Sequence, residues 1–104
     1  MVTPWEDKGE QCLIKTFKNK DLKDLFELGT SSKIQKAQHT RINNRLSALD
    51  SATSLKDLDL PGFKTHPLQG FNPTRYAISV NGAWRITFEY SGGDAYNVDL
   101  EQYH

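Results

Sequence analysis

Two histidines and one arginine in the C-terminal half of this chain have side chains suited to acid–base or charge-pairing chemistry. His66 lies in a short extended piece, Arg85 follows Trp84 in a strand-like run, and His104 ends the sequence. Histidine is the side chain that takes or gives a proton most readily near neutral pH. A structural interpretation is equally open, because surface histidines and strand arginines are often inert. Tyrosines such as Tyr103 are also compatible with packing on a sheet.

Sequence motifs for several other chemistries are missing. The chain has no glycine-rich nucleotide-binding pattern and no Gly-x-Ser-x-Gly nucleophile motif. Its three histidines lack the spacing of a local metal site, and a single cysteine, Cys12, excludes an internal disulfide. We therefore expect neither a metal ion nor a cofactor.

The formal net charge of zero conceals an uneven distribution of charge. Residues 13–49 hold eight lysines and arginines against three acids, a net charge of +5, whereas residues 1–12 and 50–104 are acidic, with net charges of -2 and -3. Such a basic segment is either a solvated helical face or a surface that meets phosphate groups. The neutral total is therefore no argument against an RNA partner.

Length and hydropathy indicate a single globular domain. The chain has 104 residues, and no apolar run approaches the roughly 20 residues needed to span a bilayer. Residues 1–12 are polar, contain Pro4 and Gly9, and show no helical or strand periodicity. We expect a flexible extension over residues 1–12, one domain over 13–104, a cytoplasmic location and no membrane partner.

The first half of the domain has one strand-like run followed by two helical patterns. Residues 13–17 alternate around an apolar set and predict a strand. Asn19 is a good N-cap and Gly29 a good C-terminal stop, so a short helix is expected between them. A second helix is predicted over residues 33–51, and a further turn over 55–58.

After residue 61 the hydrophobic period changes from 3.6 to 2. Extended segments are predicted over residues 63–67, 76–80, 84–90 and 95–99, and Asn81-Gly82 is a strong hairpin signal between the second and third of these. The sum is an α+β fold: a βαα unit followed by an antiparallel β-meander, with two helices packed on one face of the sheet.

Three stretches of this sequence resemble the HigB branch of the RelE-like toxins. They are LIKTFKNKDLKDLFELG, RINNRLSALDSATSLKDLDLPGFKTHPLQG and YAISVNGAWRITFEYSGGDAYNVDLEQYH, which together cover most of residues 13–104 in the family's order. The resemblance implies a RelE-like fold and a ribosome-dependent endoribonuclease that cuts mRNA in the ribosomal A site. It also implies a helix-turn-helix antitoxin (HigA-like), through which alone the toxin meets operator DNA.

The resemblance further implies four catalytic residues. His66 matches the histidine of the family's HPL element, and Arg85 matches the strand arginine that faces the scissile phosphate. Tyr103 and His104 match the closing tyrosine and histidine. We expect the two histidines to share the acid and base roles in an order left open, and Tyr103 to stack on a base or position the 2′-OH. No metal is needed, because the RNA's own 2′-OH is the nucleophile.

Three features depart from the family pattern. Gln69 stands where the family often has lysine, and Gln102 where it often has aspartate. These changes remove two charges from the expected site and suggest a slower or differently tuned enzyme. Family members commonly begin at the position of Leu13, so residues 1–12 are either a natural extension or an artefact of the assigned start.

The basic segment then has an expected use in docking to ribosomal RNA. The residues predicted to make these contacts are Lys18, Lys20, Lys23, Lys33, Lys36, Arg41 and Arg45. Two alternatives stay open: a non-catalytic binding module whose partner covers an open sheet edge, and a ribonuclease that acts without ribosomes.

Overall fold

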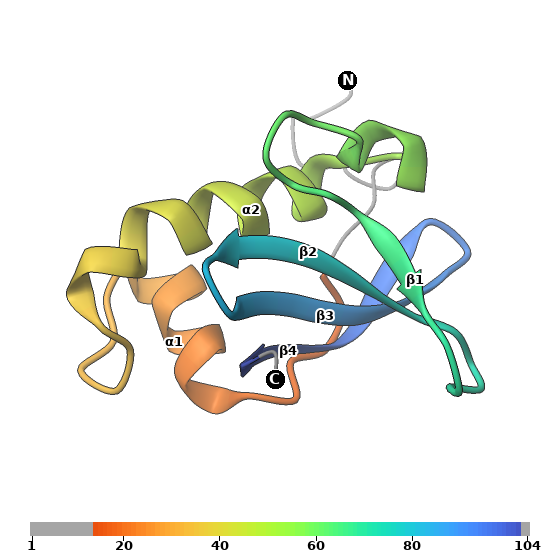
Figure 1. The fold of residues 1–104 in the computed structure, drawn as a ribbon. Helices are drawn as coiled ribbons and strands as arrows, with labels where there is room; N and C mark the ends of the chain where they lie inside the picture. Colours follow the sequence, from red (N-terminus) through yellow and green to blue (C-terminus); the bar gives the residue numbers. More distant parts are fainter. Residues whose placement is uncertain (1–13, 103–104) are drawn as a thin grey trace, which may run out of the picture.

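The protein is an α+β domain in which two helices pack against a four-stranded antiparallel sheet. The structure, a computed structural model, describes residues 14–102. The sheet has the order β1-β2-β3-β4, and both helices lie on one of its faces (Figure 1). The elements are α1 (Lys20–Leu28), the 3-10 turn η2 (Lys36–Gln38), α2 (His39–Ser51), the 3-10 turn η3 (Leu55–Leu58), β1 (His66–Leu68), β2 (Arg75–Asn81), β3 (Trp84–Ser91) and β4 (Asp94–Gln102). The predicted fold class is thereby confirmed.

Helix α1 begins and ends where its capping residues predict. The Asn19 side-chain oxygen accepts hydrogen bonds from the backbone N–H groups of Asp21 and Leu22, at 2.9 and 3.1 Å. At the other end Gly29 adopts φ 82° and donates its N–H to the carbonyl of Leu25. A residue with a Cβ is strained in this left-handed conformation, which explains why glycine closes the helix.

Helix α2 starts later than predicted. Its first residue is His39, and the preceding residues form a loop and the turn η2 instead of the helix expected from residue 33. Local hydrogen bonds explain the difference: the Ser31 hydroxyl accepts the N–H of Lys33, and His39 Nε2 lies 2.8 Å from the carbonyl of Ile34. Ile34 is buried nonetheless, so it reaches the core from the loop.

The strand predicted over residues 13–17 is wrong as a continuous strand. Ile14 and Phe17 make isolated parallel bridges to Ala95 and Val98 on the outer edge of β4; Leu13 lies outside the described residues. The ladder is interrupted because Asn97 has φ 50° and gives its N–H to the Thr16 hydroxyl, not to a backbone carbonyl. The segment still covers part of the β4 edge.

The predicted hairpin between β2 and β3 is present, with its turn one residue later than expected. Asn81 pairs with Trp84, so Gly82 and Ala83 are the central turn residues. Gly82 has φ 53°, as the mirror-image turns that suit hairpins require. The extended piece predicted over residues 63–67 is shorter than expected, because β1 begins only at His66 and Phe63 enters the core instead.

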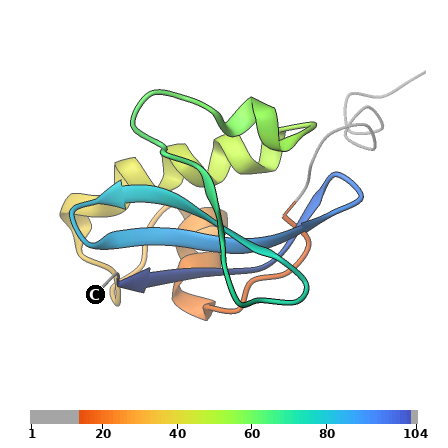
Figure 2. The same cartoon turned by 45° about the vertical axis from the view of Figure 1, so that its right-hand side comes forward.

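The core lies between the helices and the sheet, and the other face of the sheet is polar. Alternate strand residues such as Ile78, Ile86 and Phe88 are fully buried against the helices. Figure 2 shows the helices behind the sheet, with the opposite face toward the reader. We call this second face, which carries Ala77, Ser79, Arg85, Thr87 and Glu101 together with His66, the open face. Among residues 14–102 no helix is long and apolar enough to cross a membrane.

Candidate active site

Strand pairing brings His66 and Arg85 to neighbouring rows of the open face. His66 on β1 pairs with Ala77 on β2, and Arg85 on β3 pairs with Ser79 on β2. Paired residues project to the same side of a sheet, and residues two apart on one strand share a face. Both side chains line a pocket of about 200 Å³, to which Lys64, Ser79 and Trp84 also contribute. Two of the four predicted catalytic residues therefore share one pocket.

A backbone contact fixes the proton arrangement of the His66 ring. Its Nδ1 lies 2.7 Å from the carbonyl oxygen of Lys64, a residue with φ 49°. A carbonyl oxygen only accepts, so Nδ1 carries a proton and donates it to this bond. In the neutral ring Nε2 then holds the lone pair. The His66 side chain is exposed.

Arg85 supplies a permanent positive charge to the same pocket. It lies on the central strand β3, half-buried, with Glu101 directly opposite on β4. A guanidinium group stays protonated in proteins and offers paired donors that match the oxygens of a phosphate. The pocket thus combines an imidazole ring with a guanidinium group.

Tyr103 and His104 lie outside the described residues. The described part of β4 ends at Gln102, which pairs with Trp84 of the pocket. Gln102 and Gln69, where the family often has charged residues, are both exposed. The catalytic roles of Tyr103 and His104 stay predictions.

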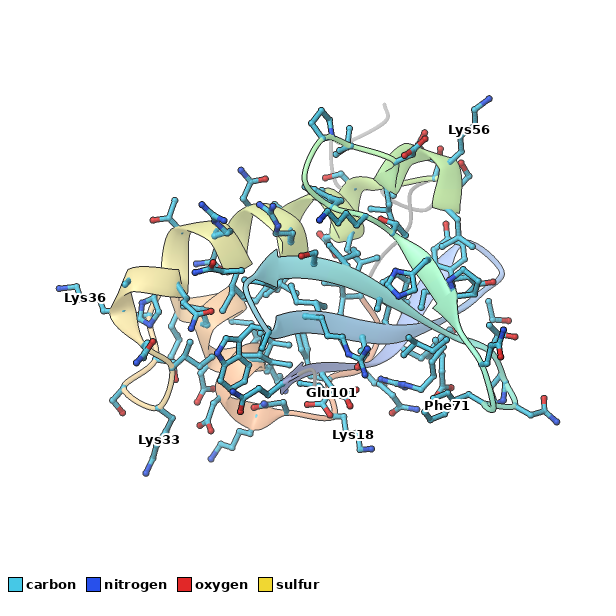
Figure 3. All side chains as sticks on the ribbon, in the orientation of Figure 1. Lys18, Lys33, Lys36, Lys56, Phe71 and Glu101 are labelled. Carbon is cyan, nitrogen blue, oxygen red and sulfur yellow. The ribbon has the colours of Figure 1, made fainter. Side chains whose placement is uncertain are left out.

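The lysines predicted to meet ribosomal RNA are all exposed. Lys33 and Lys36 project outward beside the start of α2, and Lys18 projects from below the sheet (Figure 3). Lys20 and Lys23 on α1 are exposed as well. These side chains are therefore spread over α1, the loop before α2 and the approach to β4, and their docking role stays a prediction.

The two arginines among the residues predicted to contact ribosomal RNA form hydrogen bonds within the fold. Arg41 and Arg45 donate hydrogen bonds to the carbonyls of Val80 and Ser79, at 3.3 and 3.0 Å, on the edge of β2. The Arg45 guanidinium also lies over the Phe63 ring, 4.7 Å from its centroid. Burial, and then the neighbouring charge of Arg41, lower the pKa of Arg45. Any contact of these arginines with RNA comes in addition to these bonds.

Replacing Arg45 is expected to destabilise the fold. Arg45→Ala removes the bond to Ser79 and the contact with the Phe63 ring, and we expect it to lower the free energy of unfolding by about 1–3 kcal/mol. Arg41 is exposed and its bond is longer, so Arg41→Ala should lower it by about 0.5 kcal/mol or less. Urea denaturation of both variants measures the difference, and equal losses would argue against a structural role for Arg45.

A buried polar network on the open face was missed from the sequence. Arg75, only 8% exposed, donates to Glu89 at 3.1 Å and, through Nη2, to the Thr87 hydroxyl and the Asn97 carbonyl, both at 3.0 Å. Thr87 in turn hydrogen-bonds to Glu101, and the Asn97 amide donates to Glu89. Polar residues alternating with apolar ones along β3 were the available signal, but the pairing depends on strand register. No group of three metal-ligating side chains comes together within residues 14–102.

Comparison with known proteins agrees with this architecture. A sequence model of the family described as "RelE-like toxin of type II toxin-antitoxin system HigB" matches residues 15–104. The chain is also 45% identical over 92 residues to the Endoribonuclease HigB of Proteus vulgaris, a match that covers 88% of this chain and 100% of that protein.

Proposed function

Because this chain belongs to the HigB branch of the RelE-like toxins of type II toxin–antitoxin systems, we propose that it is an endoribonuclease that cuts mRNA in the ribosomal A site. The observation that carries the proposal is the pocket shared by His66 and Arg85. An imidazole and a guanidinium lining one pocket are the groups that general acid–base catalysis and charge stabilisation in RNA cleavage would use. A related protein named as an endoribonuclease supports the reaction class.

The proposed reaction uses the RNA's own 2′-OH. His66 Nε2 takes the 2′-OH proton while the 2′-oxygen forms a bond to the adjacent phosphorus. The bond from phosphorus to the 5′-oxygen breaks, and that oxygen receives a proton from His104. The cleaved RNA then ends in a 2′,3′-cyclic phosphate. Arg85 neutralises the charge that builds on the phosphate oxygens. The Lys64 contact occupies Nδ1 of His66 and therefore leaves Nε2 as the nitrogen for proton transfer with the RNA.

The type II family implies an antitoxin partner for this chain. We assign it a helix-turn-helix antitoxin of the HigA kind, with operator DNA contacted through that antitoxin only. Ribosome and mRNA are the other partners of the proposal, and they place its action in the cytoplasm.

Inducible expression in cells tests the proposed function. Primer extension on cellular mRNA is expected to show in-frame cuts that vanish when translation is blocked. Intact mRNA during growth arrest would favour a non-catalytic binding module instead. Cleavage of naked mRNA by the pure protein at the same sites would identify a ribosome-independent ribonuclease.

Reversing the charge of Lys33 or Lys36 is expected to weaken ribosome binding. Each change, Lys33→Glu or Lys36→Glu, should flatten the dependence of log affinity on log salt by about one unit, because one fewer counterion is released. Ribosome pelleting at several salt concentrations measures this slope. Lys56→Glu is the matched control, because Lys56 is also exposed but lies on η3, far from these lysines in Figure 3. If the salt dependence of ribosome binding has the same slope in all three variants, Lys33 and Lys36 form only a solvated face.

A further inference from the structure

The polar network of the open face leads from a buried cation to the carboxylate beside Arg85. Arg75 and Thr87 are 8% and 0% exposed, and the Thr87 hydroxyl lies between the Arg75 guanidinium and Glu101. Buried polar groups hold their geometry because losing a partner inside the protein is costly. The Glu101 carboxylate is therefore attached to a rigid part of the sheet.

The direction of each hydrogen bond in this chain is fixed by chemistry. Arg75 only donates, so its Nη2 gives a proton to the Thr87 oxygen. Thr87 has one hydroxyl proton of its own, which remains for Glu101. An ionised carboxylate only accepts, so Glu101 completes the sequence of bonds as a charged acceptor. Arg75 Nη2 also donates to the Asn97 carbonyl, so Arg75 acts only as a donor in this network.

Glu101 is the cross-strand neighbour of Arg85. The two residues are paired in the β3–β4 ladder and project from the same face. Cβ atoms of such pairs lie about 5 Å apart, and opposite charges at this spacing attract. The Glu101 carboxylate, which is bonded to Thr87, thus belongs to the residue paired with Arg85 in the sheet. Resting on the proposed function, we infer that Thr87 and Glu101 are positioning residues that orient Arg85 toward the scissile phosphate.

Glu89 provides an internal comparison for this inference. Its carboxylate also belongs to the network, with bonds from Arg75 and from the Asn97 amide, each at 3.1 Å. Its partners in the ladders are Arg75 and Tyr96, however, and it lies four residues from Arg85 along β3, or about 13 Å at 3.3 Å per residue. Loss of the Glu89 charge therefore disturbs the network without touching the neighbour of Arg85.

The test compares the same chemical change at these two carboxylates. Glu101→Gln and Glu89→Gln are assayed by single-turnover cleavage of mRNA on programmed ribosomes, which yields a maximal rate and a half-saturating ribosome concentration. Glu101→Gln is expected to lower the maximal rate by about 10- to 100-fold, the scale of a misplaced catalytic group, with half-saturation unchanged. Glu89→Gln is expected to stay within about threefold of the parent protein.

A second pair of variants separates the hydroxyl from the size of the side chain. Thr87→Val keeps the branched shape but removes the hydrogen bond to Glu101 and the one from Arg75, and it should lower the maximal rate as Glu101→Gln does. Thr87→Ser restores the hydroxyl and should recover most of the rate. Glu101 and Glu89 are both half-buried, so their variants test the inference even if Thr87→Val fails to fold. In that case the maximal rates of Glu101→Gln and Glu89→Gln are compared.

The outcomes distinguish this inference from the proposed function. Equal losses in Glu101→Gln and Glu89→Gln, or a full rate in Glu101→Gln, would overturn the positioning role while the parent protein still cleaves mRNA. A parent protein that cleaves no mRNA on ribosomes would instead remove the proposed function itself.

Discussion

His66→Ala is expected to lower the rate of mRNA cleavage on ribosomes by about 10²–10⁴-fold, the usual cost of losing one acid–base group. The reason is specific to the Nε2 atom, because Nδ1 is already committed to the Lys64 carbonyl. Single-turnover cleavage on programmed ribosomes measures the loss. His66→Gln should be equally slow, since an amide cannot take a proton at neutral pH.

His39→Gln is the matched control for this experiment. His39 is a second described histidine with a ring nitrogen on a backbone carbonyl, 2.8 Å from that of Ile34, but it lies at the start of α2 and outside the His66 pocket. We expect its cleavage rate to stay within a few-fold of the parent. Growth arrest by His66→Ala at the parental level would rule out His66 as an essential base.

Arg85→Ala is expected to reduce cleavage by about 10²–10³-fold, as loss of a charge-stabilising donor does in other enzymes. Arg85→Lys should recover only part of the rate, because an ammonium keeps the charge but loses the planar pair of donors. The defect should appear in the maximal rate and not in ribosome binding, since the interaction strengthens as charge develops on the phosphate. Single-turnover cleavage on programmed ribosomes measures the maximal rate and the half-saturating ribosome concentration of each variant, and both are compared with those of the parent protein.

Arg41→Ala serves as the control for loss of an arginine in the maximal rate alone, because Arg41 belongs to the set predicted to meet ribosomal RNA. Arg41 is exposed and lies on α2, which contributes no lining residue to the pocket. Thermal unfolding of all variants shows whether the fold is intact before rates are compared. A rate for Arg85→Ala within threefold of the parent would remove the arginine from the mechanism.

Local sequence signals predicted the elements whose boundaries are set by local chemistry. The Asn19 and Gly29 caps bracket α1 as expected, because each satisfies backbone groups of its own helix. The β2–β3 hairpin follows in the same way from turn residues and alternation, with its turn one residue later than predicted. The start of α2 was misplaced because hydrogen bonds from Ser31 and His39 compete with the helix, and such competition leaves no mark on hydrophobic periodicity.

Features that depend on distant pairing were beyond the sequence. The bridges of Ile14 and Phe17 join segments about 80 residues apart, and a local pattern does not report the irregularity at Asn97 that breaks their ladder. Residue type singled out His66 and Arg85 as candidates, and the family resemblance implied their catalytic roles. Their shared pocket, and the carboxylate of Glu101 beside it, follow from strand register, which alternation narrows but does not fix.

The occupied edges of the sheet also determine how it can meet another chain. Arg41 and Arg45 take the carbonyls of Val80 and Ser79, and the Ser79 N–H donates to the Phe63 carbonyl at 2.7 Å. On the far side residues 14–18 use the backbone of β4 near Ala95 and Val98. Open strand edges are templates for aggregation and for strand addition by a partner. Because these stretches are closed, the sheet resists edge-to-edge self-association along them, and an inhibitor that binds over them must contact side chains and not backbone.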